Sequence, residues 1–175
     1  MKPYTLLLLL PFILVGCKKQ ETLMSTEIED FKIIGIAIQT TNKNGQAEED
    51  LGGLWGLFYK ENISAAIPNK TSEDVYSLFT DYESDYTGTY TAIIGHKVQS
   101  LDSVPEGFTG REFKGGKYVP FKAKGAMPQA IVDSWKEIWS RDKELKRRYT
   151  VDFEVYGPKS QQGDQSEVDI FIAVN

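Results

Sequence analysis

The chain has 175 residues, of which 41% are apolar and 26% are charged, and its formal net charge is -5. This composition excludes an intrinsically disordered chain, and the length suffices for one domain or for two small modules that share a core. The acidic balance argues against a nucleic-acid partner, for which a basic face is the expected footprint, and the single cysteine excludes an internal disulfide.

The first element along the chain is a predicted signal peptide over residues 1–16. A single early lysine precedes an apolar run from Leu6 to Val15, and a glycine and Cys17 follow directly. The run is too short for a membrane-spanning helix and has the layout of a secretory signal. Its end, LVGC, resembles the lipobox of bacterial lipoproteins. That resemblance implies cleavage before Cys17 and acylation of this residue.

An acylated Cys17 would hold the protein stably on a membrane, because each buried CH₂ group contributes about 0.8 kcal/mol. We therefore expect an exported lipoprotein anchored in the cell envelope, with the membrane and the leaflet left open. The alternative is an ordinary secretory signal with an incidental cysteine. Residues 17–30 are polar and lack periodicity, so they are predicted to be a flexible tether to a domain over residues 31–175.

The first half of that domain is predicted to contain a strand, a helix and two more strands. Residues 31–41 are rich in isoleucine and favour a strand. Apolar residues recur at helical spacing over 48–63, although three glycines weaken this helix. We expect the glycines to allow a close approach of the helix to the sheet. Strands are expected within 73–83 and 88–100.

The second half repeats this order. Residues 110–125 are extended, and a helix is predicted over 127–141, with a proline suited to its first turn. Strands follow at 149–157 and 168–174, with a polar loop between them.

The two halves also match in detail. "LWGLFY" resembles "WKEIW" in its aromatic placement, and aligning "VYSLFTDY" with "VDFEVY" places Thr80 over Glu154. Self-similarity in a fixed order predicts an α+β fold with pseudo-twofold symmetry. The sheet should be mostly antiparallel, with two helices on one side and a central ligand cleft between the halves.

The segment "YTVDFEVYG" has the alternation of a strand. Val151, Phe153 and their neighbours at two-residue spacing form a core face, and the opposite face carries Asp152, Glu154 and Tyr156. From alternation alone, Glu154 is either a solvent-exposed residue or the floor of a ligand site. Asp152 lies nearer the strand end and is assigned to the surface.

Six segments together resemble the GyrI-like effector-binding domain, also known as the AraC-type or integron-associated effector-binding domain. They are "LGGLWGLFYKENI", "DYESDYTGTYTAIIGHKV", "LDSVPEGF", "GGKYVPFKAKG", "SWKEIW" and "YTVDFEVYG". They occur in the order found in the family, and the resemblance covers nearly all of residues 31–175. The resemblance implies two SHS2 modules, each a strand-helix-strand-strand unit, with a central cleft for small molecules.

The resemblance also implies roles for particular positions. In multidrug-responsive regulators of the family, a buried glutamate on this late strand faces aromatic rings and attracts organic cations, and Glu154 matches that position. Some stand-alone members are hydrolases of reactive small molecules, with a similarly placed glutamate that assists water. The regulators carry a helix-turn-helix domain before the effector domain. Here a signal, a cysteine and a tether stand in its place, so no nucleic-acid partner is expected.

Five aromatic residues are candidate walls of a pocket around this carboxylate. Trp55 and Trp139 lie on the two predicted helices, where the alternative is core packing. Tyr90 and Phe171 lie on matching last strands of the two halves, and Tyr156 shares a face with the carboxylate. For these three the alternative is a half-exposed sheet.

Other chemistries find little support. His96 is the only histidine and has no partner at metal-ligand spacing, so no metal site is expected. A serine triad would need a nucleophile elbow, which is absent, and "KGGKY" is a poor phosphate cradle because no helix follows it. No cofactor is expected. The basic stretch over 139–149 mixes both charges and is predicted to be a solvated face.

The favoured hypothesis is a domain that binds a small, partly apolar molecule, lipophilic cations among them, with Glu154 as the charged contact. One alternative is an enzyme that hydrolyses small electrophiles, with Glu154 as general base. Another is an interaction protein of the cell envelope. The sequence leaves the oligomeric state open.

Overall fold

Eight β-strands form one antiparallel sheet in residues 23–175, the part of the chain that this computed structural model describes. The predicted signal over 1–16 and Cys17 lie outside the described residues. The strands are β1 (Thr26–Ile28), β2 (Phe31–Thr41), β3 (Val75–Thr80), β4 (Thr89–Val98), β5 (Thr109–Phe113), β6 (Gly116–Lys124), β7 (Val151–Tyr156) and β8 (Glu167–Ala173). The helices are α1 (Gln46–Lys60), α2 (Ile63–Ala66), α3 (Gln129–Ser140) and α4 (Asp142–Leu145), with short 3-10 turns at Lys43–Gly45, Pro158–Gln161 and Gly163–Gln165.

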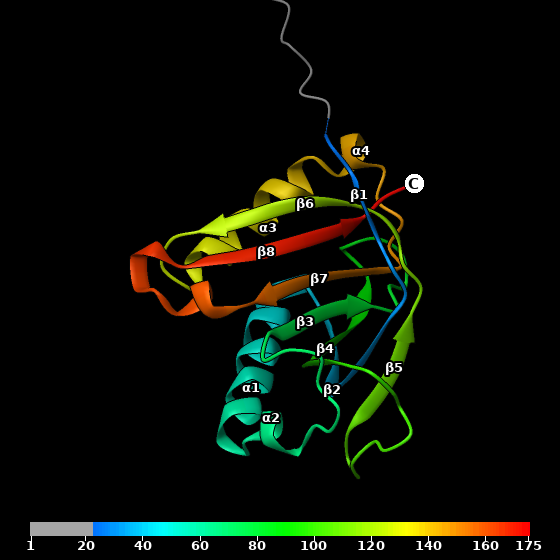
Figure 1. Ribbon diagram of the computed structural model, residues 1–175. Helices are drawn as coiled ribbons and strands as arrows, with labels where there is room; N and C mark the ends of the chain where they lie inside the picture. Colours follow the sequence, from blue (N-terminus) through cyan, green and yellow to red (C-terminus); the bar gives the residue numbers. More distant parts are fainter. Residues whose placement is uncertain (1–22) are drawn as a thin grey trace, which may run out of the picture.

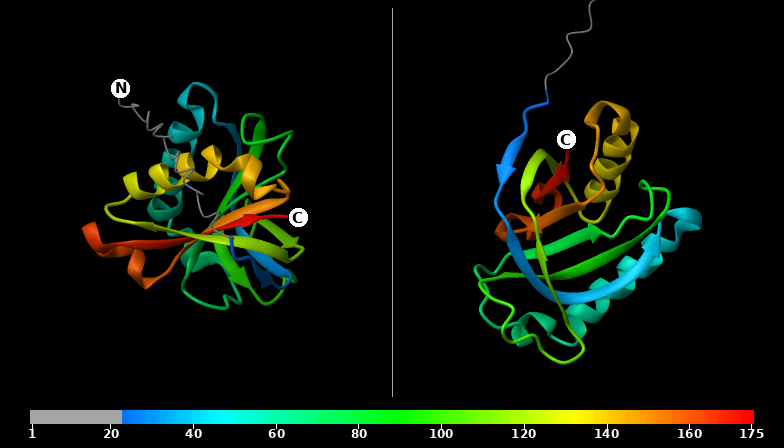
Figure 2. Two further views of the ribbon diagram at one scale, coloured as in Figure 1. Left: turned by 90° about the horizontal axis from the view of Figure 1, so that it is seen from above. Right: turned by 90° about the vertical axis from the view of Figure 1, so that its right-hand side faces the viewer.

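The internal repeat predicted from the sequence is confirmed. The first half runs β2-α1-β3-β4 and the second β6-α3-β7-β8, and the strand order β1-β6-β8-β7-β3-β4-β2-β5 is symmetric about the pair of β7 and β3. Figure 1 shows the two halves meeting at this central pair. Figure 2 shows α1 and α3 on the same side of a curled sheet, as the predicted α+β fold requires.

Two short strands lie outside the repeat and complete the sheet at its edges. β1 precedes the first half but pairs with β6, and β5 precedes the second half but pairs with β2. The turn between β1 and β2 contacts the turn between β5 and β6. There the carboxylate of Asp30 accepts hydrogen bonds from the Gly115 backbone N–H at 2.9 Å and from Lys114 Nζ at 2.6 Å. The predicted tether over 17–30 was therefore wrong for residues 26–28. A polar three-residue strand has no periodicity to detect, and its pairing partner lies far along the chain.

The two long helices pack their apolar stripes on the sheet. Leu54 and Phe58 of α1 and Trp135 and Ile138 of α3 are buried in this layer, as the helical spacing predicted. The three glycines of α1 face solvent, and a Cβ added at any of them would meet nothing within 4 Å. The expectation that they bring the helix close to the sheet was wrong. In residues 23–175, no helix is long and apolar enough to cross a membrane.

The sheet curls strongly away from the helices. The rings of Phe31 on β2 and Phe153 on β7 lie 5.3 Å apart, although β4 and β3 separate their strands. Strands this far apart in a flat sheet would be about 14 Å distant, at about 4.8 Å per strand. The face opposite the helices is therefore concave, and it encloses a second apolar cluster that includes Phe113, Tyr118 and Leu78. Each face of the sheet therefore carries a buried apolar cluster.

A pair of glycines permits a close approach of β2 and β4. Gly35 and Gly95 are paired across these strands. A Cβ at Gly35 would lie 2.2 Å from the Ile94 carbonyl oxygen, and one at Gly95 would lie 2.1 Å from the Ile34 carbonyl oxygen. Because these neighbours are backbone atoms inside a hydrogen-bonded ladder, they cannot move aside as a flexible side chain would.

We predict that Gly35→Ala lowers the free energy of unfolding by roughly 2 kcal/mol or more, because the added methyl group forces β2 and β4 apart. The matched control is Gly53→Ala on the exposed side of α1, which should raise the stability by about 0.5–1 kcal/mol. Urea denaturation of both variants measures the difference. Equal stability of the two variants would contradict this account of the strand contact.

Candidate functional site

Glu154 is a buried carboxylate under α3. The alternation of β7 directs its side chain toward the helices, together with those of Asp152 and Tyr156. Only 2% of Glu154 is exposed. The indole Nε1–H of Trp135 donates a hydrogen bond to its Oε1 at 2.6 Å, and the hydroxyl of Tyr156 donates to its Oε2 at 2.8 Å. Of the two interpretations that alternation left open, solvent exposure is therefore wrong.

Burial makes the ionised form of Glu154 more costly than it is in water. Burial raises the pKa of this carboxyl above its usual range, and the hydrogen bonds from Trp135, Tyr156 and Ser77 offset the effect only in part. Ser77 lies directly opposite Glu154 in the pairing of β3 with β7. No lysine or arginine of the described residues makes an ion pair with Glu154, so its negative charge has no counterion.

Four of the five predicted aromatic residues lie in the helix layer with Glu154. The Trp55 ring contacts that of Tyr156, with centroids 4.9 Å apart, so both lie on the side of Glu154 that faces α1. Trp139 is one helical turn from Trp135, and their centroids are 6.2 Å apart. Tyr90 is buried at 4% exposure and close enough for the Glu154 charge to raise its pKa, after the larger effect of its own burial.

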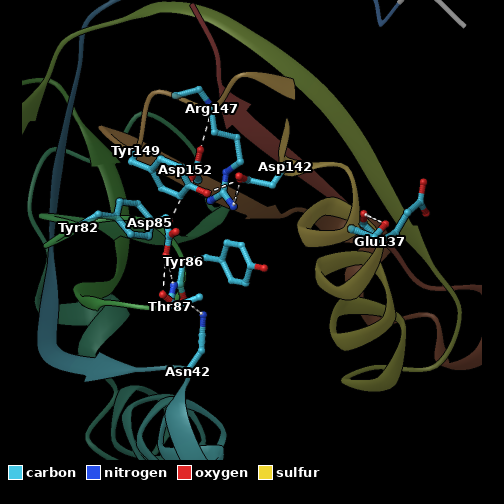
Figure 3. A network of polar contacts seen from close by, with 12 residues as sticks. Asn42, Tyr82, Asp85, Tyr86, Thr87, Glu137, Asp142, Arg147, Tyr149 and Asp152 are labelled. Carbon is cyan, nitrogen blue, oxygen red and sulfur yellow. Dashed lines mark hydrogen bonds and ion pairs between the residues drawn. The ribbon is translucent and has the colours of Figure 1, made fainter. Parts of the chain in front are cut away.

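The loop between β3 and β4 extends over this layer and connects the two halves. Tyr86 stacks on Trp139 with ring centroids 5.5 Å apart and planes within 8°. Asn42 connects this loop to β4. Its Nδ2 donates a hydrogen bond to the Tyr86 carbonyl at 2.7 Å, and its Oδ1 accepts one from the Tyr90 hydroxyl at 2.9 Å. Figure 3 shows Asn42 and Tyr86 in this arrangement.

Phe171, the fifth predicted wall residue, lies on the concave face instead. It is paired with Phe153, and the two rings stack at 5.0 Å. Because paired residues share a face, Phe171 is separated from Glu154 by the sheet itself. The alignment of Thr80 with Glu154 fails for the same reason, because Thr80 pairs with Val151 on the concave face. The β3 residues on the side of Glu154 are Val75, Ser77 and Phe79.

Trp135 is the contact that the sequence did not single out as a site residue. Its spacing from Ile131, Ile138 and Trp139 places it on the apolar stripe of α3. Of the two tryptophans, only Trp135 is buried, at 8% exposure, and only its indole nitrogen reaches a carboxylate. A polar atom on a buried aromatic ring needs a partner, and this requirement is the signal that could have linked it to Glu154.

Asp152 was assigned to the surface, and that prediction was wrong. The residue is fully buried and accepts hydrogen bonds from Arg147 Nη2 at 2.7 Å, the Tyr82 hydroxyl at 2.9 Å and the Ala173 backbone N–H at 2.8 Å. Arg147 lies in the basic stretch that was predicted to be solvated, yet its side chain is fully buried too. Figure 3 shows Asp152 and Arg147 with Tyr82 and Tyr149 around them.

This second carboxylate is structural. The Arg147 guanidinium lies over the Tyr149 ring at 4.4 Å and gives Asp152 the counterion that Glu154 lacks. A buried ion pair of this kind is costly to break, because removal of one partner leaves an uncompensated charge. The bond from Ala173 ties β8 to β7 at the same point.

His96, the only histidine of the chain, has a hydrogen-bonding role. Its Nδ1 lies 2.9 Å from the Asp74 carbonyl oxygen, which can only accept, so Nδ1 carries the proton. Burial lowers the pKa of His96, so the neutral ring leaves Nε2 to accept from the Ser64 hydroxyl at 2.7 Å. The pair ties α2 to β4.

The carboxylate of Glu154 is covered in this conformation. Two surface hollows lie elsewhere, one on the concave face and one beside the loop at residues 163–167. Contact between Glu154 and a ligand therefore requires Trp135 or Tyr156 to turn away from the carboxylate. The expected central cleft is filled by aromatic side chains at this position.

Comparison with known proteins gives consistent results. The sequence model of the family described as "Integron-associated effector binding protein" matches residues 26–174. The Bacillus subtilis (strain 168) protein YobU is 26% identical over 152 residues, which cover 85% of this chain and 95% of that one.

Solved structures are also similar to this one over most of the chain. An integron cassette protein from the mobile metagenome of Vibrio cholerae is 36% identical, with a TM-score of 0.67 that covers 87% of this chain and 95% of that one. The protein SAV2435, solved bound to tetraphenylphosphonium, is 18% identical, with a TM-score of 0.74 over 87% of this chain and 93% of that one.

The raised pKa of Glu154 predicts a pH-dependent cost to stability. The folded protein holds the Glu154 proton more tightly than the unfolded chain does. The stability that this group contributes is therefore present at pH values below its unfolded pKa and is lost as pH rises through its folded pKa. Glu154→Gln removes this titration. Relative to wild type, the variant should therefore gain stability as pH rises from about 4 to 8.

Urea denaturation at several pH values measures this difference. The other carboxylates titrate alike in the two proteins, so their effect cancels in the difference between the two free energies of unfolding. The lowest pH is the internal control, because there the two proteins should be about equally stable. A stability difference that does not change with pH would show that Glu154 is not held as described.

Proposed function

The chain belongs to the integron-associated effector-binding protein family, and on this premise we propose that it binds a small lipophilic cation at Glu154. The family supports a role in binding small-molecule effectors. The charge and the apolar character of the ligand come from the site. Glu154 supplies the negative charge, and Trp135, Tyr156, Trp55 and Tyr90 supply the aromatic surface.

The observation that carries this proposal is a buried carboxylate without a counterion. Glu154 is 2% exposed, and its oxygens are held only by neutral donors. A cation placed against it would recover the Coulomb energy that burial makes available and would offset the desolvation that now raises its pKa. Two residues away, Asp152 already forms an ion pair with Arg147, so its charge is not available to a cationic ligand.

The surrounding rings suit a ligand of this kind. A cation within about 6 Å of an aromatic face is attracted by the ring quadrupole, and the effect grows when both are removed from water. Trp135 and Tyr156 would turn from capping Glu154 to contacting the ligand. Tetraphenylphosphonium, the ligand of SAV2435, is a cation covered by apolar rings, and that protein shares the fold.

Hydrolysis with Glu154 as general base is the second candidate, and the raised pKa of its carboxyl is the observation that favours it. The geometry supports it less well, because both carboxylate oxygens accept hydrogen bonds from side chains. A hydrolase would also need a positioned water within hydrogen-bond reach of one of these oxygens. Turnover of a small reactive ester that is lost in Glu154→Gln would favour this second function.

We also propose that the domain is anchored to a membrane of the cell envelope through acylated Cys17. The support is the sequence alone: an apolar run that is followed directly by LVGC. The first strand begins at Thr26, so few residues separate the anchor from the sheet. In this arrangement the domain would bind its ligand close to the membrane surface.

For the ligand, we predict that tetraphenylphosphonium raises the melting temperature of the wild type by roughly 5 °C or more when its concentration is about 100 times its Kd. Glu154→Gln should abolish most of this shift, because a neutral amide cannot offset the charge. A thermal-shift assay measures both. Glu48→Gln, which changes an exposed carboxylate of α1, should behave like the wild type.

Neutral triphenylphosphine oxide is the matched ligand control, and it should shift neither protein by a comparable amount. An equal shift by tetraphenylphosphonium in wild type and Glu154→Gln would rule out Glu154 as the charged contact.

For the anchor, labelled fatty acid should enter the full-length wild type during expression in a bacterial host and should not enter Cys17→Ser. The thiol is the site of the first acyl linkage, and serine cannot replace it in the lipobox. Autoradiography of the purified proteins measures the label. Equal labelling of both would remove Cys17 from the proposal.

A further inference from the structure

The concave face of the sheet carries a hollow that the proposed function does not use. It has a volume of about 250 Å³ and is bounded by residues of β2, β3, β4, β7 and β8, with Ile28 of β1 at one side. Its floor lies on the side of β7 opposite to Glu154, because Phe153 and Val155 alternate with that residue along the strand. The curl of the sheet makes this face the mouth of a half-barrel, a common place for ligands.

The walls of the hollow are aromatic. Phe153 and Phe171 stack at 5.0 Å with planes within 23°, and Phe31 packs on Phe153 at 5.3 Å. The Tyr76 ring lies 6.1 Å from that of Phe153. Phe171 and Tyr76 are only partly buried, so their faces remain available to a guest. A flat aromatic molecule fits such walls, since offset stacking contributes about 0.5–1.5 kcal/mol per ring pair beyond its burial.

Two donors converge on the hollow from adjacent strands. Tyr76 pairs with Gly95, and Lys97 follows two residues later on the same face of β4. Burial raises the pKa of the Tyr76 phenol, so its hydroxyl stays protonated at neutral pH and can donate. Within residues 23–175 the Lys97 ammonium forms no ion pair or hydrogen bond, and the Tyr76 hydroxyl forms no hydrogen bond. The ammonium lies 5.8 Å from the Phe31 ring.

The remaining charge in the hollow is already neutralised. Asp169 lies at the other end, opposite Val155, and forms an ion pair with Lys122 on β6. The unpaired charge of the hollow is therefore the positive charge of Lys97. Its sign is opposite to that of the unpaired charge at Glu154, and the two groups lie on opposite faces of one sheet.

We propose that this hollow is a second binding site that takes a planar aromatic carboxylate. The ring of the ligand lies against Phe153 and Phe171, and its carboxylate accepts hydrogen bonds from Lys97 Nζ and the Tyr76 hydroxyl. Charge-assisted hydrogen bonds of this kind are about twice as strong as neutral ones. The site stands independently of the proposed cation site, because it uses other residues and the opposite charge.

The test uses 2-naphthoate as the probe and isothermal titration calorimetry on the purified full-length chain. Wild type should bind 2-naphthoate saturably. Lys97→Met should weaken the binding by about tenfold or more, and Tyr76→Phe, which keeps the ring, by about threefold. The uncharged 2-naphthamide should bind wild type and Lys97→Met about equally, since it does not depend on the ammonium.

Lys32→Met is the matched control. Lys32 is also a half-buried lysine, on the neighbouring strand β2, but it pairs with Val98 of the helix-facing cluster. This variant and Glu154→Gln should bind 2-naphthoate like the wild type. Melting temperatures without ligand verify that each variant is folded.

Three outcomes would overturn the proposal. One is the lack of saturable 2-naphthoate binding by wild type up to about 1 mM. Another is equal affinity of wild type, Lys97→Met and Tyr76→Phe. The third is loss of 2-naphthoate binding in Glu154→Gln with retention in Lys97→Met. That result would show that 2-naphthoate binds on the helix-facing side of the sheet. Each is distinguishable from failure of the cation site, which is measured with tetraphenylphosphonium.

Discussion

The pairing of β3 with β7 at the centre of the sheet is the constraint on which the other features depend. It joins the two halves and sets the register in which Ser77 faces Glu154 and Leu78 faces Phe153. Because alternate residues of a strand point to opposite sides, this one register places a carboxylate under the helices and an aromatic ring in the concave cluster. A slip of one residue would exchange the two and bury the charge among phenylalanines.

Two carboxylates on β7 illustrate how the environment divides structural from functional roles. Asp152 has a buried arginine, a tyrosine hydroxyl and a backbone N–H, so its charge is satisfied within the fold. Glu154 has an indole and a phenol, which hold its oxygens but do not neutralise them. The first arrangement stabilises a junction between strands. The second leaves a negative charge without a counterion, and this is the physical reason that a cationic ligand suits it.

The near symmetry of the two halves sharpens this contrast. Each half supplies one long helix and three long strands, and the sheet order mirrors across the central pair. The helix-facing side of β3 nevertheless carries no charged residue: Val75, Ser77 and Phe79 lie opposite Tyr156, Glu154 and Asp152 of β7. The symmetric framework provides a place where two helices meet one sheet. The charge that makes it a site comes from one half only.

The sequence by itself determined the order of the elements, the repeat, the family and the set of residues that share a side of β7. The order, the repeat and the shared side follow from local periodicity, which a single chain displays without knowledge of its neighbours. The family follows from the resemblance of six segments. Only the tertiary structure decided what covers each side. Glu154 is capped by Trp135, Asp152 is paired with Arg147, and Phe171 belongs to the concave cluster. Residues 26–28 join the sheet because β6 offers them a partner. Alternation tells which side chains lie together, but burial and charge compensation depend on contacts between segments far apart in the chain.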